Sequence, residues 1–251
     1  MKLQGVTALV TGAGKRLGRA IALALAEGGA DLVLHVHSST TTDLVAEIQA
    51  MGRRVRVITA DLSAPGAVQR VSQDALHDTG TIDVLVNSAA VFYPTPLFKL
   101  SVEEWRKVVH VNMTTPLILG MVLGREMKKR GKGKIIQLGD WSGQRPVRSY
   151  LPYCVAKGGL HMSTMALAKA LAPHVQVNEV VLGPVLPPAN YEARALQALS
   201  AATPLQRLGE PADVLRTVRF LIEAGDFVTG ASYVVDGGWL VHPPGEMSTS
   251  L

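Results

Sequence analysis

The alternation of short apolar runs with amphipathic segments constrains the fold of this chain more than any other feature. Several of the runs are apolar at consecutive positions, as parallel strands covered on both faces are. The segments between them have helical periodicity, with Leu17, Ile21 and Leu25 on one stripe and Val214 and Val218 on another. The predicted strands are 6–10, 32–36, 55–58, 84–86, 135–138, 175–181 and 233–235. This order predicts an α/β fold: a single-domain, doubly wound (Rossmann) parallel sheet of about seven strands with helices on both faces, spanning residues 1–251.

Polar residues or glycines follow six of these runs. In a parallel sheet the carboxyl ends of the strands meet at one edge, where doubly wound proteins bind their ligands. Packing alone does not explain six such exits at one edge, so we expect a ligand site there. The exits are residues 11–18, 37–39, 61–62, 87–90, 140 and 183–184, and they include Asp61, Leu62, Asn87, Ala89 and Gly183.

The first exit contains three glycines, Gly12, Gly14 and Gly18, between a predicted strand and a predicted helix. Glycines at this place let the backbone approach a pyrophosphate at the helix N-terminus. A purely structural tight turn could also require glycine. Because the strand and the helix that the binding motif needs are both present, the sequence favours a dinucleotide site.

The residues after the second strand indicate which dinucleotide is bound. An NAD site usually has a carboxylate there to bind the ribose hydroxyls. Asp31 has about the right separation from the glycines but lies at the wrong end of the strand, and the exit itself is His37-Ser38-Ser39. With no acid to repel a 2′-phosphate, and with Lys15 and Arg16 nearby, NADPH is the predicted cofactor. His35 and His37 lack a third ligand for a metal, so no metal is expected.

A tyrosine and a lysine four residues apart form the candidate catalytic pair. Tyr153 and Lys157 lie on a predicted helix over 150–171, so both project from one face, and Asp140 ends the preceding strand. A phenol has a pKa of about 10 and is a poor acid at neutral pH unless a cation stabilises its anion. We therefore expect Lys157 to lower the pKa of Tyr153. Because Tyr-x-x-x-Lys also occurs by chance on helices, this motif needs support from the rest of the chain.

Composition and charge limit the remaining possibilities. The net charge is +5, but lysine and arginine are scattered apart from a cluster at 128–134, which is typical of a helix end rather than a nucleic-acid site. A single cysteine, Cys154, excludes an internal disulfide and is expected to be packed rather than nucleophilic. No apolar run approaches 18 residues and no leader pattern is seen at the start. We expect a cytoplasmic protein that binds a small molecule, with neither nucleic acid nor membrane as a partner.

With these residues placed, the chain resembles the short-chain dehydrogenase/reductases over essentially its whole length. The matching motifs occur in the same order and are Thr11-Gly12…Gly18, Asp61-Leu62, Asn87 with Ala89, Asn112, Tyr153-x-x-x-Lys157, Asn178 and Asp236-Gly237-Gly238. The resemblance implies that Leu17, Leu62, Ala89 and Gly183 contact the cofactor and that Lys157 binds the nicotinamide ribose. It also implies that Asn112, at a break in its helix, anchors a water that relays protons to Lys157. Pairing through helices over 102–130 and 150–171 would give a homotetramer.

Two departures from the family pattern resemble its pteridine reductase branch. Arg16 replaces the middle glycine, and Asp140 replaces the catalytic serine. The resemblance implies that Arg16 touches the cofactor phosphates and the pterin, that Phe92 stacks on the pterin, and that Asp140 and Tyr153 deliver the proton. Residues 184–205 would form the substrate loop. The predicted function is reduction of a dihydropterin, biopterin or folate by NADPH.

Two other functions stay open at this point. The first is an NADPH-dependent reductase of carbonyls, such as 3-oxoacyl thioesters or cyclic ketones, against which Asp140 and Phe92 argue by resemblance. The second is a nucleotide-sensing regulator without catalysis. Loss of Tyr153 or Lys157 would have favoured a regulator, and both are present.

Overall fold

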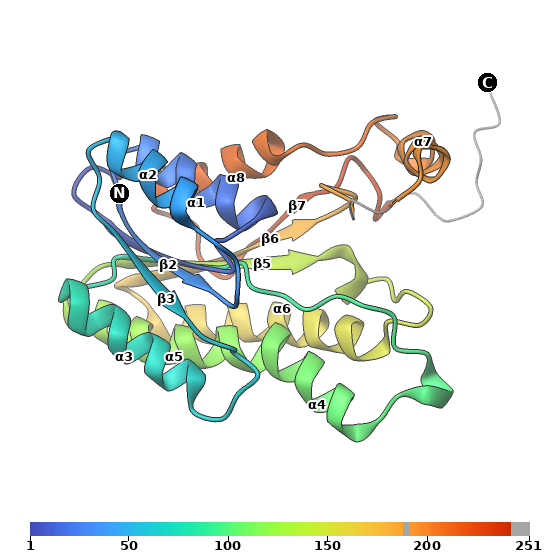
Figure 1. Cartoon of the computed structure of the whole chain (residues 1–251), viewed down its shortest axis with the longest axis horizontal. Coiled ribbons are helices and arrows are strands. Elements are labelled where there is room, and N and C mark those ends of the chain that lie inside the picture. The colour runs from blue at the N-terminus through green and yellow to red at the C-terminus, as the bar shows by residue number, and fades with distance from the viewer. Residues whose placement is uncertain (188–190, 242–251) are drawn as a thin grey trace.

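A seven-stranded parallel sheet forms the centre of the structure, a computed structural model that describes residues 1–187 and 191–241. The strand order is β3-β2-β1-β4-β5-β6-β7 (Figure 1). The strands are β1 (Thr7–Thr11), β2 (Asp31–Val36), β3 (Val55–Thr59), β4 (Val84–Asn87), β5 (Gly133–Asp140), β6 (Val175–Leu182) and β7 (Ser232–Val235). Each predicted strand is confirmed to within two residues at either end.

Helices cover both faces of this sheet, which confirms the doubly wound fold (Figure 1). One face carries α1 (Arg16–Glu27), α2 (Thr42–Ala50) and α8 (Pro211–Glu223), and the other carries α3 (Ala67–Thr79), α4 (Val102–Val109), α5 (Thr115–Lys129) and α6 (Leu151–Leu171). Each layer encloses its own apolar core: Ile21 and Val218 belong to the first, and Leu119 and Leu167 to the second. A further helix, α7 (Ala193–Ala202), lies beyond the carboxyl edge of the sheet.

The stretch Val102–Lys129 is helical throughout but changes its winding in the middle. A π-helical turn, His110–Thr114, joins α4 to α5, and it contains Asn112 where a helix break was expected. The stretch is long and apolar enough to cross a bilayer, yet half of its most apolar window is buried inside the protein. A core helix of a globular domain has the same property, and this stretch packs on the sheet and on α6.

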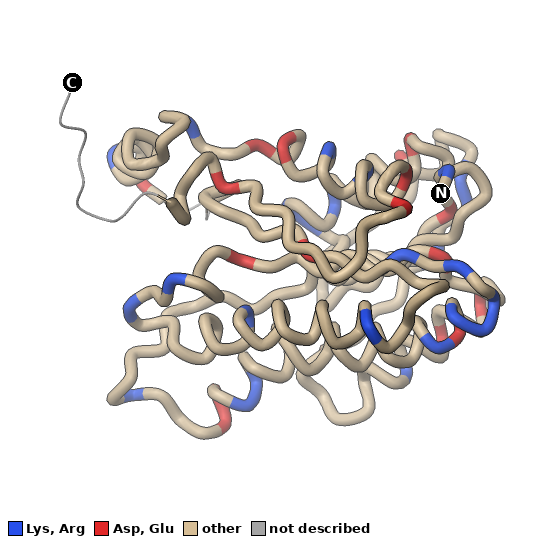
Figure 2. The backbone as a smooth tube through the Cα atoms, turned by 180° about the vertical axis from the view of Figure 1, so that it is seen from behind, with Lys and Arg blue, Asp and Glu red and all other residues tan. Residues whose placement is uncertain are grey.

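Basic and acidic residues are scattered over the whole fold (Figure 2). The cluster at 128–134 follows the end of α5, where two of its cations are engaged in ion pairs with other elements. Arg130 pairs with Asp83 at 2.8 Å, and the buried Lys134 pairs with Asp226 at 2.7 Å. These cations therefore tie the amino edge of the sheet to its neighbouring loops.

Candidate active site

A cavity of about 870 Å³ lies at the carboxyl edge of the sheet. The strand order reverses between β1 and β4, so the connections that follow these two central strands leave in opposite directions. That reversal opens a crevice in doubly wound sheets. Of the predicted site residues, all except Asn87 and Asn112 line the cavity. The structure thus brings the separate strand exits into one site.

The glycine turn forms one wall of this cavity. Gly12 has a φ of +67°, and a Cβ built on it would lie 2.9 Å from the Cα of Ala89, so a larger residue would be both strained and crowded. A Cβ on Gly18 would collide with the carbonyl oxygen of Gly12. The first residues of α1 follow directly, and the N-cap residue Lys15 makes no side-chain capping hydrogen bond. The backbone N–H groups at this helix start are therefore available to an anion.

His35 is a functional neighbour of this turn that sequence reasoning treated as an ordinary histidine. Its Nδ1 accepts a hydrogen bond from the Gly12 N–H at 3.3 Å, and its Nε2 donates to the Ala60 carbonyl at 3.0 Å. Burial lowers the pKa of His35, which favours the neutral ring that this pattern requires. The one indication of this contact in the sequence was the position of His35 near the carboxyl end of β2, the strand next to β1 and its glycines.

Two polar residues at the ends of β1 and β4 hold the crevice in shape. Thr11 Oγ1 accepts hydrogen bonds from the N–H groups of Ser88 at 3.0 Å and Ala89 at 3.1 Å. Asn87 was predicted to contact the cofactor, but its side chain is buried beneath the site and donates to Gln137 Oε1 at 2.9 Å. The structure therefore gives the side chain of Asn87 a position under the sheet edge rather than in the cavity.

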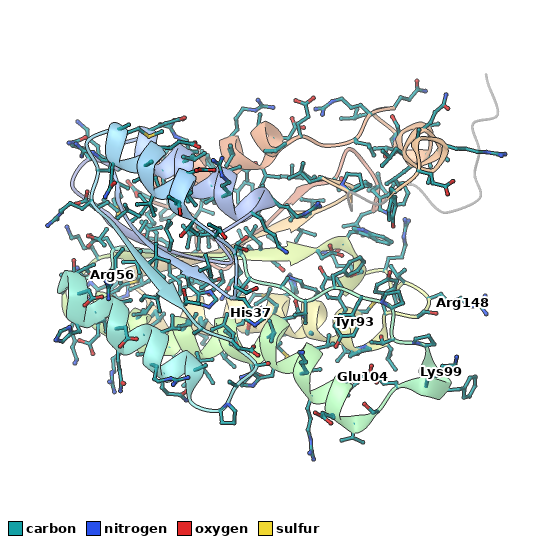
Figure 3. The ribbon with its side chains drawn as sticks, in the orientation of Figure 1. His37, Arg56, Tyr93, Lys99, Glu104 and Arg148 are labelled. Carbon is teal, nitrogen blue, oxygen red and sulfur yellow. The ribbon has the colours of Figure 1, made fainter. Side chains whose placement is uncertain are left out.

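The residues that follow β2, His37-Ser38-Ser39, include no carboxylate, as the prediction of NADPH required. Asp31 begins β2 at the amino edge, where it pairs with Arg54 at 2.8 Å, so it cannot serve a ribose at the other end. Ser38 and Ser39 line the cavity, and His37 lies 3.8 Å from Asp61 on the next exit. Figure 3 shows His37 and Tyr93 toward the carboxyl side of the sheet and Arg56 toward the amino side.

Arg16 links the glycine turn to the chain that follows β6. Its φ is +53°, in the left-handed region that glycine adopts easily and that other residues adopt rarely. Its guanidinium donates to the carbonyl oxygens of Leu186 and Pro187. Arg16 therefore spans the mouth of the cavity. The predicted substrate loop, 184–205, is described only outside 188–190, and Leu186 and Tyr191 both line the cavity.

Asp140 and Tyr153 meet at the centre of the site. The Asp140 carboxylate lies beside the Tyr153 hydroxyl, close enough to raise its pKa, and it accepts the Ser142 N–H at 2.9 Å. Burial raises the pKa of Asp140, which favours its protonated form. Burial and the adjacent carboxylate also raise the pKa of Tyr153 well above 10. Both shifts favour the protonated forms, so release of the Tyr153 proton depends on a nearby cation that stabilises the phenolate.

Lys157 is fully enclosed on the same helix face. Its Nζ donates to the Leu138 carbonyl at 2.6 Å and lies 5.6 Å from the centre of the Tyr153 ring. Burial lowers the pKa of Lys157, and the carboxylates of Asp140 and Glu179 oppose that effect. The prediction that Lys157 lowers the pKa of Tyr153 is wrong for this structure, because burial and Asp140 dominate the environment of the phenol.

Asn112 stands at the helix break that was predicted, but its side chain is engaged elsewhere. Its amide donates to the carbonyls of Val91 and Val108, both at 2.9 Å, and its oxygen accepts the Val91 N–H at 3.3 Å. Asn112 thereby fixes the loop after β4, which carries Phe92. Its part in a proton relay stays a prediction.

Aromatic rings surround the catalytic pair. Phe92 stacks on Tyr150 with centroids 4.4 Å apart and an interplanar angle of 14°, and its ring meets Tyr153 edge-on at 4.8 Å. Trp141 and Trp239 line the cavity as well and contact each other at 5.7 Å. Tyr150 was not among the predicted site residues, and only the fold places it opposite Phe92. Cys154 is buried against Val147, as expected for a packed thiol.

These residues fit a nicotinamide dinucleotide. The glycine turn presents a cradle that side chains would fill, the start of α1 can bind a pyrophosphate, and the exit of β2 has no acid of its own. Lys157 and Tyr153 line the opposite end of the same cavity, where the reactive ring of an extended dinucleotide would lie.

Comparisons with known proteins identify the family. A sequence model described as "Enoyl-(Acyl carrier protein) reductase" matches residues 12–240. The chain is 33% identical to a 3-oxoacyl-[acyl-carrier-protein] reductase of Synechocystis sp., with 95% of this chain and 98% of that protein covered. It is also 33% identical to the 2-dehydro-3-deoxy-D-gluconate 5-dehydrogenase of Bacillus subtilis, with 95% and 96% covered.

A solved structure agrees with these relatives. The blue fluorescent protein from a metagenomic library, crystallised in complex with NADPH, superposes with a TM-score of 0.87 at 32% identity, covering 95% of this chain and 99% of that one. The sequence motifs, the sheet order and these matches lead to one conclusion: the chain belongs to the short-chain dehydrogenase/reductase family of nicotinamide-dependent oxidoreductases.

Proposed function

We propose that this enzyme is an NADPH-dependent reductase of a pterin ring, with a dihydropterin, a biopterin or a folate as substrate. One observation carries the proposal: a buried carboxylate, Asp140, is the partner of the Tyr153 hydroxyl at the position where the family pattern has a serine. A pterin presents an amide and amino edge that hydrogen-bonds well to a carboxylate, whereas a simple ketone has no such donors.

The residues account for the proton side of this reaction. NADPH, when bound, supplies the hydride that reduces a ring C=N bond at carbon. Tyr153, kept neutral by its raised pKa, donates the proton to nitrogen, and Asp140 orients the hydroxyl and the ring edge. Lys157 binds the nicotinamide ribose, and the flat ring of the substrate lies against Phe92. The stack of Phe92 on Tyr150 supports this placement, because an aromatic substrate ring would join an existing aromatic cluster.

A carbonyl reductase is the second candidate. It is supported by the similarity to a 3-oxoacyl-[acyl-carrier-protein] reductase and to a sugar-acid dehydrogenase. Tyr153 and Lys157 would serve that chemistry equally well, with the proton passing to the carbonyl oxygen. Asp140 distinguishes the two functions, because its carboxyl group can pair with the amide and amino edge of a pterin, which a simple ketone lacks.

The test follows NADPH oxidation by absorbance with dihydrobiopterin, dihydrofolate and an acetoacetyl thioester side by side. Turnover with a pterin and none with the thioester is expected. Turnover with only the thioester would overturn the pterin assignment and leave the family assignment intact.

We further propose that the enzyme is a homotetramer. The helical stretch Val102–Lys129 and α6 carry exposed apolar side chains, among them Met121, Val155 and Met162. Covering such residues is a common reason for association. Light scattering coupled to size-exclusion chromatography should give four times the chain mass of 26.7 kDa, and a monomeric mass would reject this assembly.

A further inference from the structure

A buried carboxylate on β6, Glu179, lies outside the cavity but close enough to influence Lys157. Glu179 is 1% exposed, and among the ion pairs of the described residues its only cationic partner within 4 Å is His161, at 2.8 Å. Taking a carboxylate out of water is costly unless charge or hydrogen bonds compensate for it. An apolar residue would pack here without this desolvation cost, so we looked for a function of the carboxylate at this position.

The carboxylate is held in one place by two hydrogen bonds. His161 Nδ1 donates to Glu179 Oε2, and Ser232 Oγ donates to the same oxygen at 2.6 Å. His161 Nδ1 also lies 3.0 Å from Ser232 Oγ, so the three groups form a closed triangle. The elements that supply them, α6, β6 and β7, are packed directly against one another. Because two side chains hydrogen-bond to it, the Glu179 carboxylate is restricted to one position.

The other oxygen of Glu179 lies beside the part of β5 whose backbone carbonyl accepts a hydrogen bond from Lys157. A Cβ on Gly139 would collide with Glu179 Oε1, so the carboxylate lies directly over the Gly139 backbone. Lys157 Nζ donates to the carbonyl of Leu138, the preceding residue. The ammonium and the carboxylate therefore lie on one two-residue stretch of β5. His161 is also one helical turn beyond Lys157 on α6.

We propose that Glu179 is a positioning residue for the reaction: its carboxylate, fixed by His161 and Ser232 over Gly139, is the second counter-ion that keeps the Lys157 ammonium charged at the nicotinamide ribose. Asp140 is the first counter-ion, but it also serves Tyr153 and the substrate. Glu179 supplies a negative charge outside the reacting cavity, since it is not among the cavity-lining residues.

The other charged groups around Lys157 do not duplicate this role. Asp140 approaches from β5, Glu179 from β6, and Tyr153 and His161 lie one turn away on α6. Lys107 of α4 lines the same cavity and is a like charge. The carboxylates of Asp140 and Glu179 both favour the charged amine against its burial. Removal of either one should therefore make the lysine easier to deprotonate.

The test measures the ionisation of Lys157 directly, with no substrate needed. Protein labelled with 13C at lysine Cε is titrated by NMR, and the Lys157 signal is assigned by its loss in Lys157→Arg. In Glu179→Gln the titration midpoint of Lys157 should fall by about one pH unit relative to wild type. Ser232→Ala, which removes a hydrogen bond but no charge, is the matched control and should move the midpoint much less.

A second readout separates the electrostatic role from a purely structural one. NADPH affinity, measured by cofactor fluorescence, should weaken at a lower pH in Glu179→Gln than in wild type, whereas Glu179→Asp should restore the wild-type profile in part. If Glu179→Gln does not fold, Glu179→Ser carries the same expectation. An unchanged Lys157 midpoint in a folded variant without the carboxylate overturns the proposal, and so does an equal shift in Ser232→Ala.

Discussion

At the residue scale, the function depends on how burial changes the ionisation of a few side chains. Asp140, Tyr153 and Lys157 lie in one cavity, and for each of them burial is the largest influence on the pKa. Burial favours the neutral form of every group, so it stabilises the protonated acid and the protonated phenol while it weakens the ammonium. The site thus holds its protons tightly, so donation depends on the Lys157 cation, which in turn needs nearby carboxylates to stay charged.

Replacing Tyr153 with Phe tests the proton donor. The change removes one oxygen from a buried side chain and leaves the ring that packs on Phe92. We expect kcat to fall about 10²–10⁴-fold, the usual contribution of a general acid, with the Kd for NADPH nearly unchanged. Tyr233→Phe, far from the cavity and packed on Phe220, is the matched control. Turnover retained in Tyr153→Phe would reject the role.

Asp140 also predicts a pH dependence of stability. Because the folded-state pKa of Asp140 is raised above 3.8, folding is favoured by this group below that pH, and the benefit is lost as pH rises through the folded pKa. Asp140→Asn should therefore raise Tm at pH 8 and change it less at pH 4. The pKa of Asp61 is lowered by its hydrogen bonds to Ser63, so Asp61→Asn should show the opposite sign at pH 8. Thermal unfolding followed by circular dichroism measures both, and equal effects of the two variants would contradict the assigned environments.

At the scale of the elements, helix starts and strand ends place the site residues. The helix α4 begins with a complete capping box, in which Ser101 Oγ accepts the Glu104 N–H at 3.1 Å and Glu104 accepts the Ser101 N–H at the same distance. This helix leads into the π-helical turn that contains Asn112, and Asn112 in turn fixes the Phe92 loop. A local signal in the sequence thus helps to set one wall of the cavity.

Ser101→Ala should lower the free energy of unfolding by about 1 kcal/mol, as expected for the loss of an N-cap. The matched control is Thr41→Ala at the start of α2, where the N-cap side chain makes no capping hydrogen bond. Thr41→Ala should lower the free energy of unfolding by only a small fraction of the loss expected for Ser101→Ala. Urea denaturation of both variants measures the difference, and equal losses would show that the capping hydrogen bond of Ser101 does not contribute.

The elements themselves could be predicted from the sequence, and so could most of the site. Apolar runs and helical stripes have a fixed period, so β1 to β7 and the site residues at their carboxyl ends follow from the pattern. Contacts between side chains of distant segments could not be predicted. His35 under Gly12, Tyr150 against Phe92 and Glu179 over Gly139 each depend on strand register and helix placement. The pKa of Tyr153 was misjudged for the same reason, since the degree of burial has no signal in local spacing.

At the scale of the whole molecule, the sheet brings two separate halves of one reaction together. The strand order reverses between β1 and β4, and this reversal places the glycine turn of the first strand and the catalytic helix α6 around one cavity. Arg16 connects the turn to the chain after β6 across the mouth of that cavity. The topology therefore brings these segments to one cavity, and in the proposed function Asp140 and the aromatic wall select the substrate.

The most direct measurement of this account compares wild type with Asp140→Ser, using initial rates of NADPH oxidation with dihydrobiopterin and with an acetoacetyl thioester. The account predicts pterin turnover in wild type that falls at least about 10²-fold in Asp140→Ser, while the thioester rate stays the same or rises. Wild type that is inactive with the pterin, or a variant in which both rates fall by the same factor, would contradict the pairing of a carboxyl with Tyr153 as the device that selects the substrate.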